Sequence, residues 1–333
     1  MSAAEHRDLI PWYHPKKLLI SFRRSPPLVA FALSALLFLI TILINPKGLN
    51  NRFIGSLILL TTLLAISSAG QTIVLIGGGM DFSVGAVMSA AAIIATYTMD
   101  KQDSVLIYVQ VLALSLLMGA VVGLLNGFFV VKIGLPAMIV TMAVSNIITR
   151  LQYVFTSGSP AGWAGQKFVD SIIYRFFDLI PSIVIYALLF VPVVFWILNR
   201  SRFGKQVYMV GNNRQAAYLT GVRVNWVIIM TYVISGMMSA FAGILGAGYK
   251  ATARVDIFGE YAFTSLVAVI VGGTTFSGGV GTYTGTIAGA LLMTVLSNLL
   301  TTLGLPQTMR DILNGVIIIL LLMLYNRSKA VRQ

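Results

Sequence analysis

Residues 211–221 read Gly-Asn-Asn-Arg-Gln-Ala-Ala-Tyr-Leu-Thr-Gly and form the centre of a polar island, 200–226, between two long apolar segments. An Asn that can cap a helix, a run of helix formers and a closing Gly predict a helix of about two turns. Such a helix is roughly 12 Å long, which fits a surface cleft but cannot cross a bilayer. The island also holds five basic residues: Arg200, Arg202, Lys205, Arg214 and Arg223. We interpret it as the part of a membrane protein that docks onto a soluble partner.

The composition around this island is that of an integral membrane protein. Hydrophobic residues make up 57% of the 333 residues and charged residues 10%, whereas soluble domains hold about 25% charged residues. The net charge of +13 is concentrated in loops, as membrane topology requires, so nucleic acid is not an expected partner. The chain has no Cys, and its two histidines, His6 and His14, lie near the start. We therefore expect no disulfide, no metal site and no cofactor.

Apolar runs predict an all-α fold of about ten transmembrane helices, within a range of eight to ten. The segment 84–99 is short and rich in Ala, and 261–272 is half a span, so either is a candidate re-entrant or broken helix. The first run is long for a signal peptide and lacks a cleavage pattern, so we interpret it as a retained span. The candidate spans are 28–45, 54–76, 84–99, 105–131, 135–156, 179–199, 227–249, 261–272, 284–303 and 310–326.

The distribution of Lys and Arg predicts the orientation. Five basic residues precede the first span, five lie in the island, three follow the last span, and Lys132 lies in a short loop. Ten spans place these fourteen on one side against eight on the other, so both termini are expected in the cytoplasm. We predict a cytoplasmic N-terminal tail (1–27), a single transmembrane domain (28–326) that contains loop 200–226, and a cytoplasmic C-terminal tail (327–333). The longest outer loop, 157–178, is a candidate contact for an external protein.

A first glycine-rich break interrupts an apolar helix at Gln71–Gly85. Asp81 follows three consecutive glycines and is the only acidic residue between positions 9 and 99. An ionised Asp at mid-membrane costs about 2.5–3.5 kcal/mol on insertion scales, so it requires a partner, a cap role or a boundary position. The preferred interpretation is a cap for the following helix; a gate hinge or a place in the substrate path stays open. The candidate break or gate residues here are Gly79, Asp81, Ser83 and Gly85.

A second break, at 271–281, reads Val-Gly-Gly-Thr-Thr-Phe-Ser-Gly-Gly-Val-Gly. The predicted topology places both breaks on the same face, so shared glycine use explains their similarity better than an inverted repeat does. The segment is not a phosphate loop, because no Lys-Ser or Lys-Thr follows it. Nothing in the chain is expected to hydrolyse ATP. The candidate residues are Gly272, Gly273, Thr274, Gly278 and Gly279.

Small and polar residues inside the spans allow two interpretations. Gly119–Gly123 and Gly285–Gly289 have the small-xxx-small spacing, which favours internal helix packing over a dimer contact. Most polar side chains in spans hold helices together, but hydroxyls and amides also suit a path for a neutral polyhydroxy solute. The candidate path residues are Asn126, Asn146 and Asn298.

Together, four motifs resemble the inner-membrane permease of sugar-type ABC importers, the family that includes ribose, xylose, galactose and arabinose permeases. They are Gly79-Met80-Asp81-Phe82-Ser83-Val84-Gly85; Gly123-Leu124-Leu125-Asn126-Gly127 with Leu135-Pro136 and Ile139-Val140-Thr141; the island segment 211–221; and Gly272-Gly273-Thr274 with Ser277-Gly278-Gly279. The first is similar to the family's Gly-Ile-Asp-Leu-Ser-Val-Gly. The resemblance extends from about residue 54 to 325.

This resemblance implies partners that the chain does not itself contain. An external binding protein would deliver the solute, two permease subunits would form the path, and cytoplasmic ATPases would drive the cycle. The island helix would be the coupling helix, formed by Gly211, Asn212, Asn213, Arg214, Gln215, Ala216, Ala217, Tyr218, Leu219, Thr220 and Gly221.

Two departures from the family pattern leave questions open. Gln215 stands where the family usually has Glu, and Tyr261-Ala262-Phe263-Thr264-Ser265 stands where it often has Tyr-Glu-Leu-Asp-Ala. The contacts with the ATPase, the identity of the solute and the choice between homodimer and heterodimer therefore stay open.

The sequence thus predicts a permease subunit of the bacterial inner membrane without catalytic residues of its own, which passes a monosaccharide or related polyol inward. The alternative is a stand-alone ion-coupled or facilitative carrier, in which Asp81 would carry a proton or cation. A membrane-embedded enzyme is disfavoured, because the spans contain no His, no Cys and no paired carboxylates.

Overall fold

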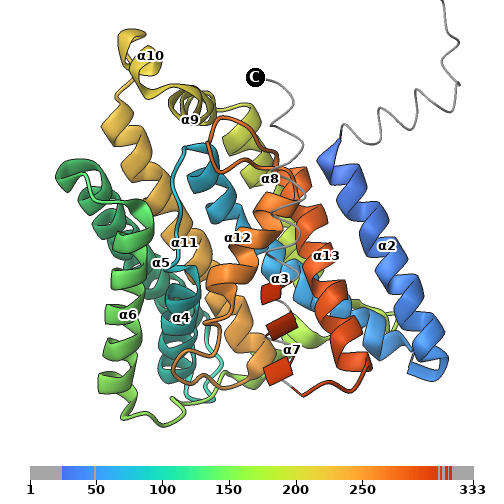
Figure 1. Cartoon of the computed structure of the whole chain (residues 1–333). Helices are drawn as coiled ribbons and strands as arrows, with labels where there is room; N and C mark the ends of the chain where they lie inside the picture. Colours follow the sequence, from blue (N-terminus) through green and yellow to red (C-terminus); the bar gives the residue numbers. More distant parts are fainter. Residues whose placement is uncertain (1–24, 49, 307, 310–311, 314, 317–333) are drawn as a thin grey trace, which may run out of the picture.

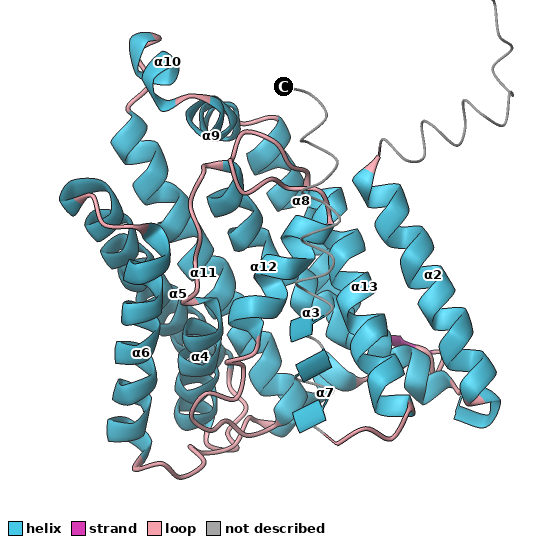
Figure 2. Cartoon of the chain, viewed as in Figure 1, coloured by secondary structure: helices cyan, strands magenta, loops and turns pink. Residues whose placement is uncertain are grey.

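The computed structural model describes residues 25–48, 50–306, 308–309, 312–313 and 315–316. These residues form a bundle of helices (Figure 1), and their only strands are a two-stranded hairpin of two residues per strand (Figure 2). The predicted all-α multi-pass architecture is confirmed.

The helices follow the apolar runs of the sequence and add short elements between them. The first half of the chain contains α2 (Pro26–Ile44), the 3₁₀ turn η1 (Pro46–Gly48), α3 (Asn51–Ile76), α4 (Val84–Met99), α5 (Val105–Phe128), the π-helical turn η2 (Phe129–Ile133), α6 (Ala137–Thr156) and α7 (Gln166–Ile173). The second half contains β1 (Arg175–Phe176), β2 (Ile180–Pro181), α8 (Ile183–Asn199), α9 (Arg202–Asn212), α10 (Arg214–Leu219), α11 (Val224–Lys250), α12 (Tyr261–Val271) and α13 (Tyr283–Thr302).

Six described helices are long and apolar enough to cross a membrane, namely α2, α3, α5 with η2, α6, α11 and α13. A seventh span is obtained if α8 and α9, which meet at 59°, are taken together. The two segments expected to be short, α4 and α12, are apolar helices of 16 and 11 residues. Nine of the ten expected spans thus correspond to a described helix. The tenth, 310–326, lies largely outside the described residues.

The helices divide into central and peripheral members. Each span contains an apolar stretch of 18 residues. In α3, α11 and α13, 61–67% of that stretch is buried inside the protein, whereas in α2 only 17% is buried. An apolar helix that is not covered by protein is expected to face lipid. The helix breaks therefore lie in the centre of the bundle, because α3 leads into the first break and α13 follows the second.

Glycines allow the central helices to approach closely. A Cβ on Gly119 of α5 would lie 2.3 Å from the carbonyl oxygen of Gly236 of α11, and one on Gly123 would lie 2.2 Å from that of Tyr232. On α13, a Cβ on Gly289 would lie 1.9 Å from the carbonyl oxygen of Ala268 of α12. Both small-residue stripes thus pack inside one chain, which is the interpretation favoured from sequence.

The molecule has two distinct ends (Figure 1). The α10 helix lies at one end, and α7 with the loops that precede α5 and α12 lies at the other. Backbone hydrogen bonds join these loops, from Lys101 N to the Trp163 oxygen (3.0 Å) and from Ala161 N to the Ala253 oxygen (2.9 Å). The carboxylate of Asp103 accepts hydrogen bonds from Lys167 N (3.1 Å) and Phe168 N (3.3 Å), and so caps α7.

Candidate functional site

The short helix α10 is capped as the sequence predicts. The side-chain oxygen of Asn213 accepts hydrogen bonds from the backbone N–H groups of Gln215 (2.9 Å) and Ala216 (3.0 Å). Ala217 is only 2% exposed and packs in a hydrophobic cluster of the protein body. Tyr218 and Leu219 are 71% and 81% exposed at the tip. The helix therefore presents an apolar, solvent-facing tip while one small side chain holds it to the bundle.

The island differs from the single helix expected at its centre. Residues 202–212 form a helix of their own, α9, which Ser201 caps by accepting a hydrogen bond from Gly204 N (2.9 Å). Gly211 and Asn212 are its last two residues, so they precede the α10 cap rather than belong to α10.

In the first break, Asp81 is 1% exposed and accepts hydrogen bonds from three groups. Its Oδ1 accepts from the backbone N–H (2.9 Å) and the hydroxyl (2.5 Å) of Ser83, and its Oδ2 accepts from the hydroxyl of Ser235 (2.8 Å) on α11. Ser83 also accepts a hydrogen bond from the side-chain amide of Asn126 (2.9 Å) on α5. The carboxylate thus fixes the residue just before α4 and joins the break to two other helices.

The orientation of these hydrogen bonds bears on the role of Asp81. Asn126 donates to Ser83, Ser83 donates to Asp81, and Ser235 donates to Asp81. An ionised carboxylate accepts only, so this arrangement of donors satisfies it without a counter-cation. The geometry agrees with the structural interpretation, although the carboxylate holds the residue before α4 rather than the first N–H groups of the helix.

The second break forms a tight turn that contacts the first. The backbone N–H of Gly279 donates a hydrogen bond to the carbonyl oxygen of Ile76 (2.8 Å), at the end of α3. Gly278 has a φ of +79°, and a Cβ there would lie 2.9 Å from Gly78 Cα. The two breaks, about 200 residues apart in the sequence, are therefore in direct backbone contact at the same level of the bundle.

The last turn of α9 completes this contact. A Cβ on Gly211 would lie 1.8 Å from the Ile76 carbonyl oxygen and 2.5 Å from the Gly279 nitrogen. One turn earlier, the Tyr208 hydroxyl donates a hydrogen bond to the Gly281 carbonyl oxygen (2.8 Å). We call the meeting point of Ile76, Gly78, Gly211, Gly278 and Gly279 the glycine junction. It joins both helix breaks to the element that carries α10.

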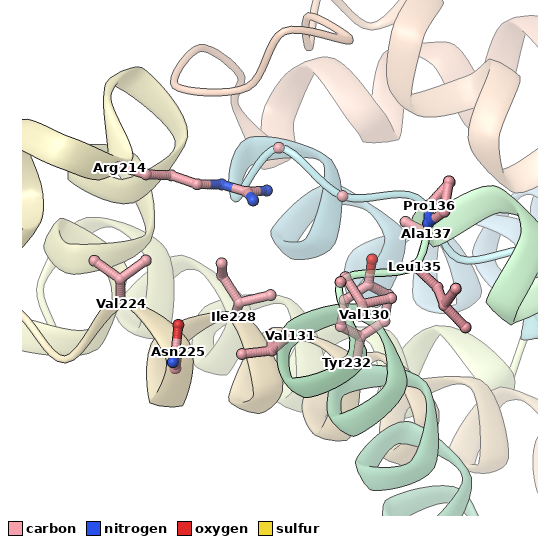
Figure 3. A pocket seen from close by; sticks show the side chains of 13 residues that line it. Val130, Val131, Leu135, Pro136, Ala137, Arg214, Val224, Asn225, Ile228 and Tyr232 are labelled. Atoms are coloured by element: carbon pink, nitrogen blue, oxygen red, sulfur yellow. The ribbon is translucent and has the colours of Figure 1, made fainter.

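Two hollows lie beside α6. The one at its first residue, Ala137, is near α10 and is called the inner hollow; the one along residues 142–153 is called the outer hollow. The inner hollow, of about 380 Å³, lies beside the first break and is shown in Figure 3. Arg214 extends from α10 toward the break, where its guanidinium is 3.9 Å from a Cβ placed on Gly78. The other walls are mainly apolar: Val130, Val131, Leu135, Pro136, Ala137, Val224 and Ile228, with Asn225 and Tyr232.

The outer hollow, of about 350 Å³, has a more polar wall. The rings of Phe82 and Phe263 meet edge to face here, with centroids 5.2 Å apart. The backbone N–H of Phe82 donates to the Thr141 hydroxyl (3.1 Å), which fixes the first break against α6. The polar residues that line the hollow are Ser145, Asn146, Thr149, Arg150, Tyr153 and Asp256.

The three candidate path residues lie in different surroundings. Asn146 lines the outer hollow. Asn126 is fully buried in the Asp81 network, and Asn298 donates to the Thr294 carbonyl oxygen (2.9 Å) within α13; neither lines one of these two hollows.

Three other glycines of the breaks are closely packed. A Cβ on Gly79 would lie 2.5 Å from the Tyr232 hydroxyl, and one on Gly85 would lie 2.6 Å from the Phe258 carbonyl oxygen. A Cβ on Gly272 would lie 2.2 Å from the carbonyl oxygen of Gly285.

Sequence reasoning missed the charged residues of the outer hollow. Arg150 lies inside an apolar run, and an isolated cation within a span is itself a signal of function. Asp256 lies in a loop with ordinary polar neighbours, where nothing in the sequence distinguishes it. Gln152, which accepts a hydrogen bond from Asp256 N (3.2 Å) and donates one to the Ala86 carbonyl oxygen (2.9 Å), joins this loop to α4 and α6.

The known proteins that this chain resembles are permease components of transport systems. A family model described as "Branched-chain amino acid transport system / permease component" matches residues 53–322. The ribose import permease protein of Escherichia coli K12 is 29% identical over 308 residues, which cover 90% of this chain and 94% of the relative. The galactose/methyl galactoside import permease proteins of E. coli K12 and Haemophilus influenzae are 31% and 32% identical and cover 85% and 86% of this chain and 90% of each relative.

No solved structure matches the chain. The family model nevertheless covers most of its length, and two relatives above 30% identity match 85% and 86% of it. The chain belongs to this family of transport-system permease components.

Proposed function

We propose that the protein is the membrane permease subunit of an ATP-binding-cassette importer and forms the inward path for a monosaccharide or related polyol. The observation that carries this proposal is the placement of two hollows beside the first helix break, one at the start of α6 and the other farther along it. The segment from Gly79 to Phe82 lies between them, since Gly79 lines the inner hollow and Phe82 lines the outer one. This position supports a gate at the first break.

The class of solute is supported by two independent observations. The relatives named above are import permeases for ribose and for galactose. The outer hollow is lined by hydroxyl, amide and aromatic groups, which suit a neutral molecule that both donates and accepts hydrogen bonds. The printed description of the family refers to branched-chain amino acids, so an amino acid is the substrate class to test beside sugars.

Features of three surfaces of the chain support the proposed partners. The tip of α10 would dock into a cytoplasmic ATPase, because it presents Tyr218 and Leu219 to solvent at the basic end of the molecule. The opposite end, with α7 and its neighbouring loops, would receive an external binding protein. A second permease subunit, identical or paralogous, would complete the walls of the hollows, since both are partly open in a single chain. Residues 28–326 would act as one transmembrane domain in the bacterial inner membrane, with both termini in the cytoplasm.

The stand-alone carrier has less support from the geometry. A carboxylate that carries a proton or cation must exchange its partners during each cycle. Asp81 is instead enclosed by three fixed donors from Ser83 and Ser235 and is 1% exposed. We therefore assign the energy source to a partner ATPase.

Affinity purification of the intact protein in mild detergent, followed by mass spectrometry, tests the docking assignment. Leu219→Arg places a charge at the α10 tip without disturbing the buried Ala217. Phe177→Arg is the matched control, because Phe177 is 94% exposed at the other end of the molecule. We expect an ATPase with the wild type and with Phe177→Arg, and its loss with Leu219→Arg.

Two outcomes would overturn the assignments. An ATPase retained by Leu219→Arg would refute docking through α10. Absence of any ATPase under conditions that preserve other membrane complexes would make the stand-alone carrier the leading function. ATP-driven uptake of labelled ribose or galactose into proteoliposomes that contain the whole complex and its binding protein tests transport itself.

A further inference from the structure

We infer that the outer hollow is a recognition site for the solute itself, in which Asp256 and Arg150 bind hydroxyl groups of a monosaccharide. The inference rests on the proposed function and extends it, because it assigns part of the selectivity to the permease rather than to an external binding protein. Both residues line the same hollow but come from different segments, the loop before α12 and the outer half of α6.

Asp256 is held in an unusual conformation by several contacts. Its φ is +58°, a left-handed value that costs an Asp residue about 1 kcal/mol and must be stabilised by its surroundings. Its backbone N–H donates to the buried Gln152, and nearby Phe258 N donates to the Ser89 hydroxyl (3.0 Å). The carboxylate lies directly over Gly259, where a Cβ would be 2.4 Å from Oδ1.

This arrangement leaves the Asp256 carboxylate available to a ligand. It accepts no hydrogen bond from any residue that the structure describes, although the hydrogen bonds of Asp256 N and Phe258 N hold the backbone around it. Partial desolvation raises the pKa of Asp256 above its ordinary value. A constrained backbone that presents an unpartnered carboxylate in a concave wall is the pattern of a preorganised binding group.

Arg150 supplies the complementary chemistry. Its guanidinium lies over the Tyr153 ring, 5.8 Å from the centroid, and makes no ion pair with a described carboxylate. In the same hollow, Asn146 uses its amide N–H₂ on the Met142 carbonyl oxygen (3.1 Å), which leaves its side-chain oxygen as an acceptor. Phe82 and Phe263 provide an apolar surface in the same hollow.

These groups match the two kinds of surface on a monosaccharide. Each sugar hydroxyl both donates and accepts, so a carboxylate, a guanidinium and an amide oxygen can each bind one. The C–H face of the sugar would lie on the phenylalanine rings. A volume of about 350 Å³ is at the lower end of the range for small-molecule sites, which suits one sugar ring. A zwitterionic amino acid would use the same two charges but leave Ser145, Asn146 and Thr149 without a role.

Saturation-transfer NMR on the purified importer complex in detergent, with D-ribose, D-galactose and L-leucine as separate probes, tests this site directly. The variants are Asp256→Asn and Arg150→Gln. Asp178→Asn is the matched control, because Asp178 also has a left-handed φ (+56°) and lies in the loop between β1 and β2, and it does not line the hollow. We expect a sugar signal for the wild type and for Asp178→Asn, and at least a tenfold weaker affinity in each hollow variant.

Failure of this inference is distinguishable from failure of the proposed function. If the importer transports a sugar but the permease shows no sugar signal, or if both hollow variants bind like the wild type, the recognition site is refuted while the transport function stands. A signal from leucine alone would refute the substrate class. Absence of ATP-driven uptake of any sugar tested by the complete importer would count against the proposed function instead.

Discussion

The Gly211→Ala substitution tests whether the glycine junction holds the two helix breaks together. The added Cβ would lie 1.8 Å from the Ile76 carbonyl oxygen and 2.5 Å from the Gly279 nitrogen. An ordinary contact between a carbon atom and a carbonyl oxygen needs about 3.4 Å, so α9 or the two breaks must move apart by roughly 1.5 Å. Such a movement would separate the two atoms of the hydrogen bond from Gly279 N to the Ile76 oxygen, now 2.8 Å apart.

The expected change in the free energy of unfolding is the sum of three contributions. Overpacking of a closely packed site costs about 1–3 kcal/mol, and loss of the hydrogen bond adds about 1 kcal/mol. The gain in helix propensity from Gly to Ala, about 1 kcal/mol, offsets part of this. We therefore expect Gly211→Ala to lower the free energy of unfolding by about 1–3 kcal/mol, and to reduce transport per ATP hydrolysed by the reconstituted complex.

Gly221→Ala is the control, because Gly221 follows α10 in the same island and has no atom within 4 Å of an added Cβ. Its φ is +83°, so the expected loss of stability is the strain of a left-handed Ala, about 1–2 kcal/mol. We expect no effect on the ratio of transport to ATP hydrolysis. The measurements are thermal unfolding in detergent, and uptake and ATP hydrolysis in the same proteoliposomes. An unchanged ratio of transport to ATP hydrolysis in Gly211→Ala would refute the coupling argument, and wild-type stability would refute the packing argument.

Three further predictions concern buried and capping hydrogen bonds. Asp81→Ala leaves the donors of Ser83 and Ser235 without an acceptor and should destabilise the protein by about 2–4 kcal/mol, with a smaller loss for Asp81→Asn, as thermal unfolding would show. Thr72→Val removes a buried hydroxyl contact to Thr286 (2.7 Å), and a double-mutant cycle with Thr286→Val should give a coupling of about 1 kcal/mol; no coupling would contradict it. Desolvation raises the pKa of Asp103, but hydrogen bonds from Tyr108, Lys167 N and Phe168 N outweigh it and hold that pKa below its ordinary value. This carboxylate therefore stabilises the fold above its unfolded pKa of about 3.9, and the contribution is lost as pH falls through the folded pKa; unfolding curves of Asp103→Asn should depend less on pH in that range than those of the wild type.

The helical segments were predictable from the sequence because lipid exposure requires long apolar runs. The two breaks were predictable for a related reason, since consecutive glycines interrupt an otherwise apolar helix. The α9 and α7 helices were missed because they are short and amphipathic and lie in polar loops. Their stability comes from packing and from caps such as Asp103, which is more than 60 residues distant in the sequence.

The candidate site was predictable only in part, because its contacts join distant segments. Asp81 was identified as an isolated acid in an apolar region, but its partner Ser235 lies 154 positions away and has no sequence signal. Asn126 was considered a path residue, whereas the structure places it in the Asp81 network. The contact between the breaks and the environment of Asp256 depend on tertiary structure, which a single sequence does not encode in a readable pattern.

The length of α12 has a consequence for how the protein is made. Its 11 residues extend about 16 Å, roughly half the thickness of the hydrocarbon core, so α12 cannot settle alone as a transmembrane helix. Lipid cannot satisfy the backbone groups exposed where it ends, and the first break, next to α3, provides the partner for Gly279. The α12–α13 hairpin must therefore enter a site that was synthesised about 200 residues earlier. Membrane insertion of this chain should finish with a late step that depends on the first half, so that deletion of α3 and the first break leaves α12 without a stable position in the bilayer.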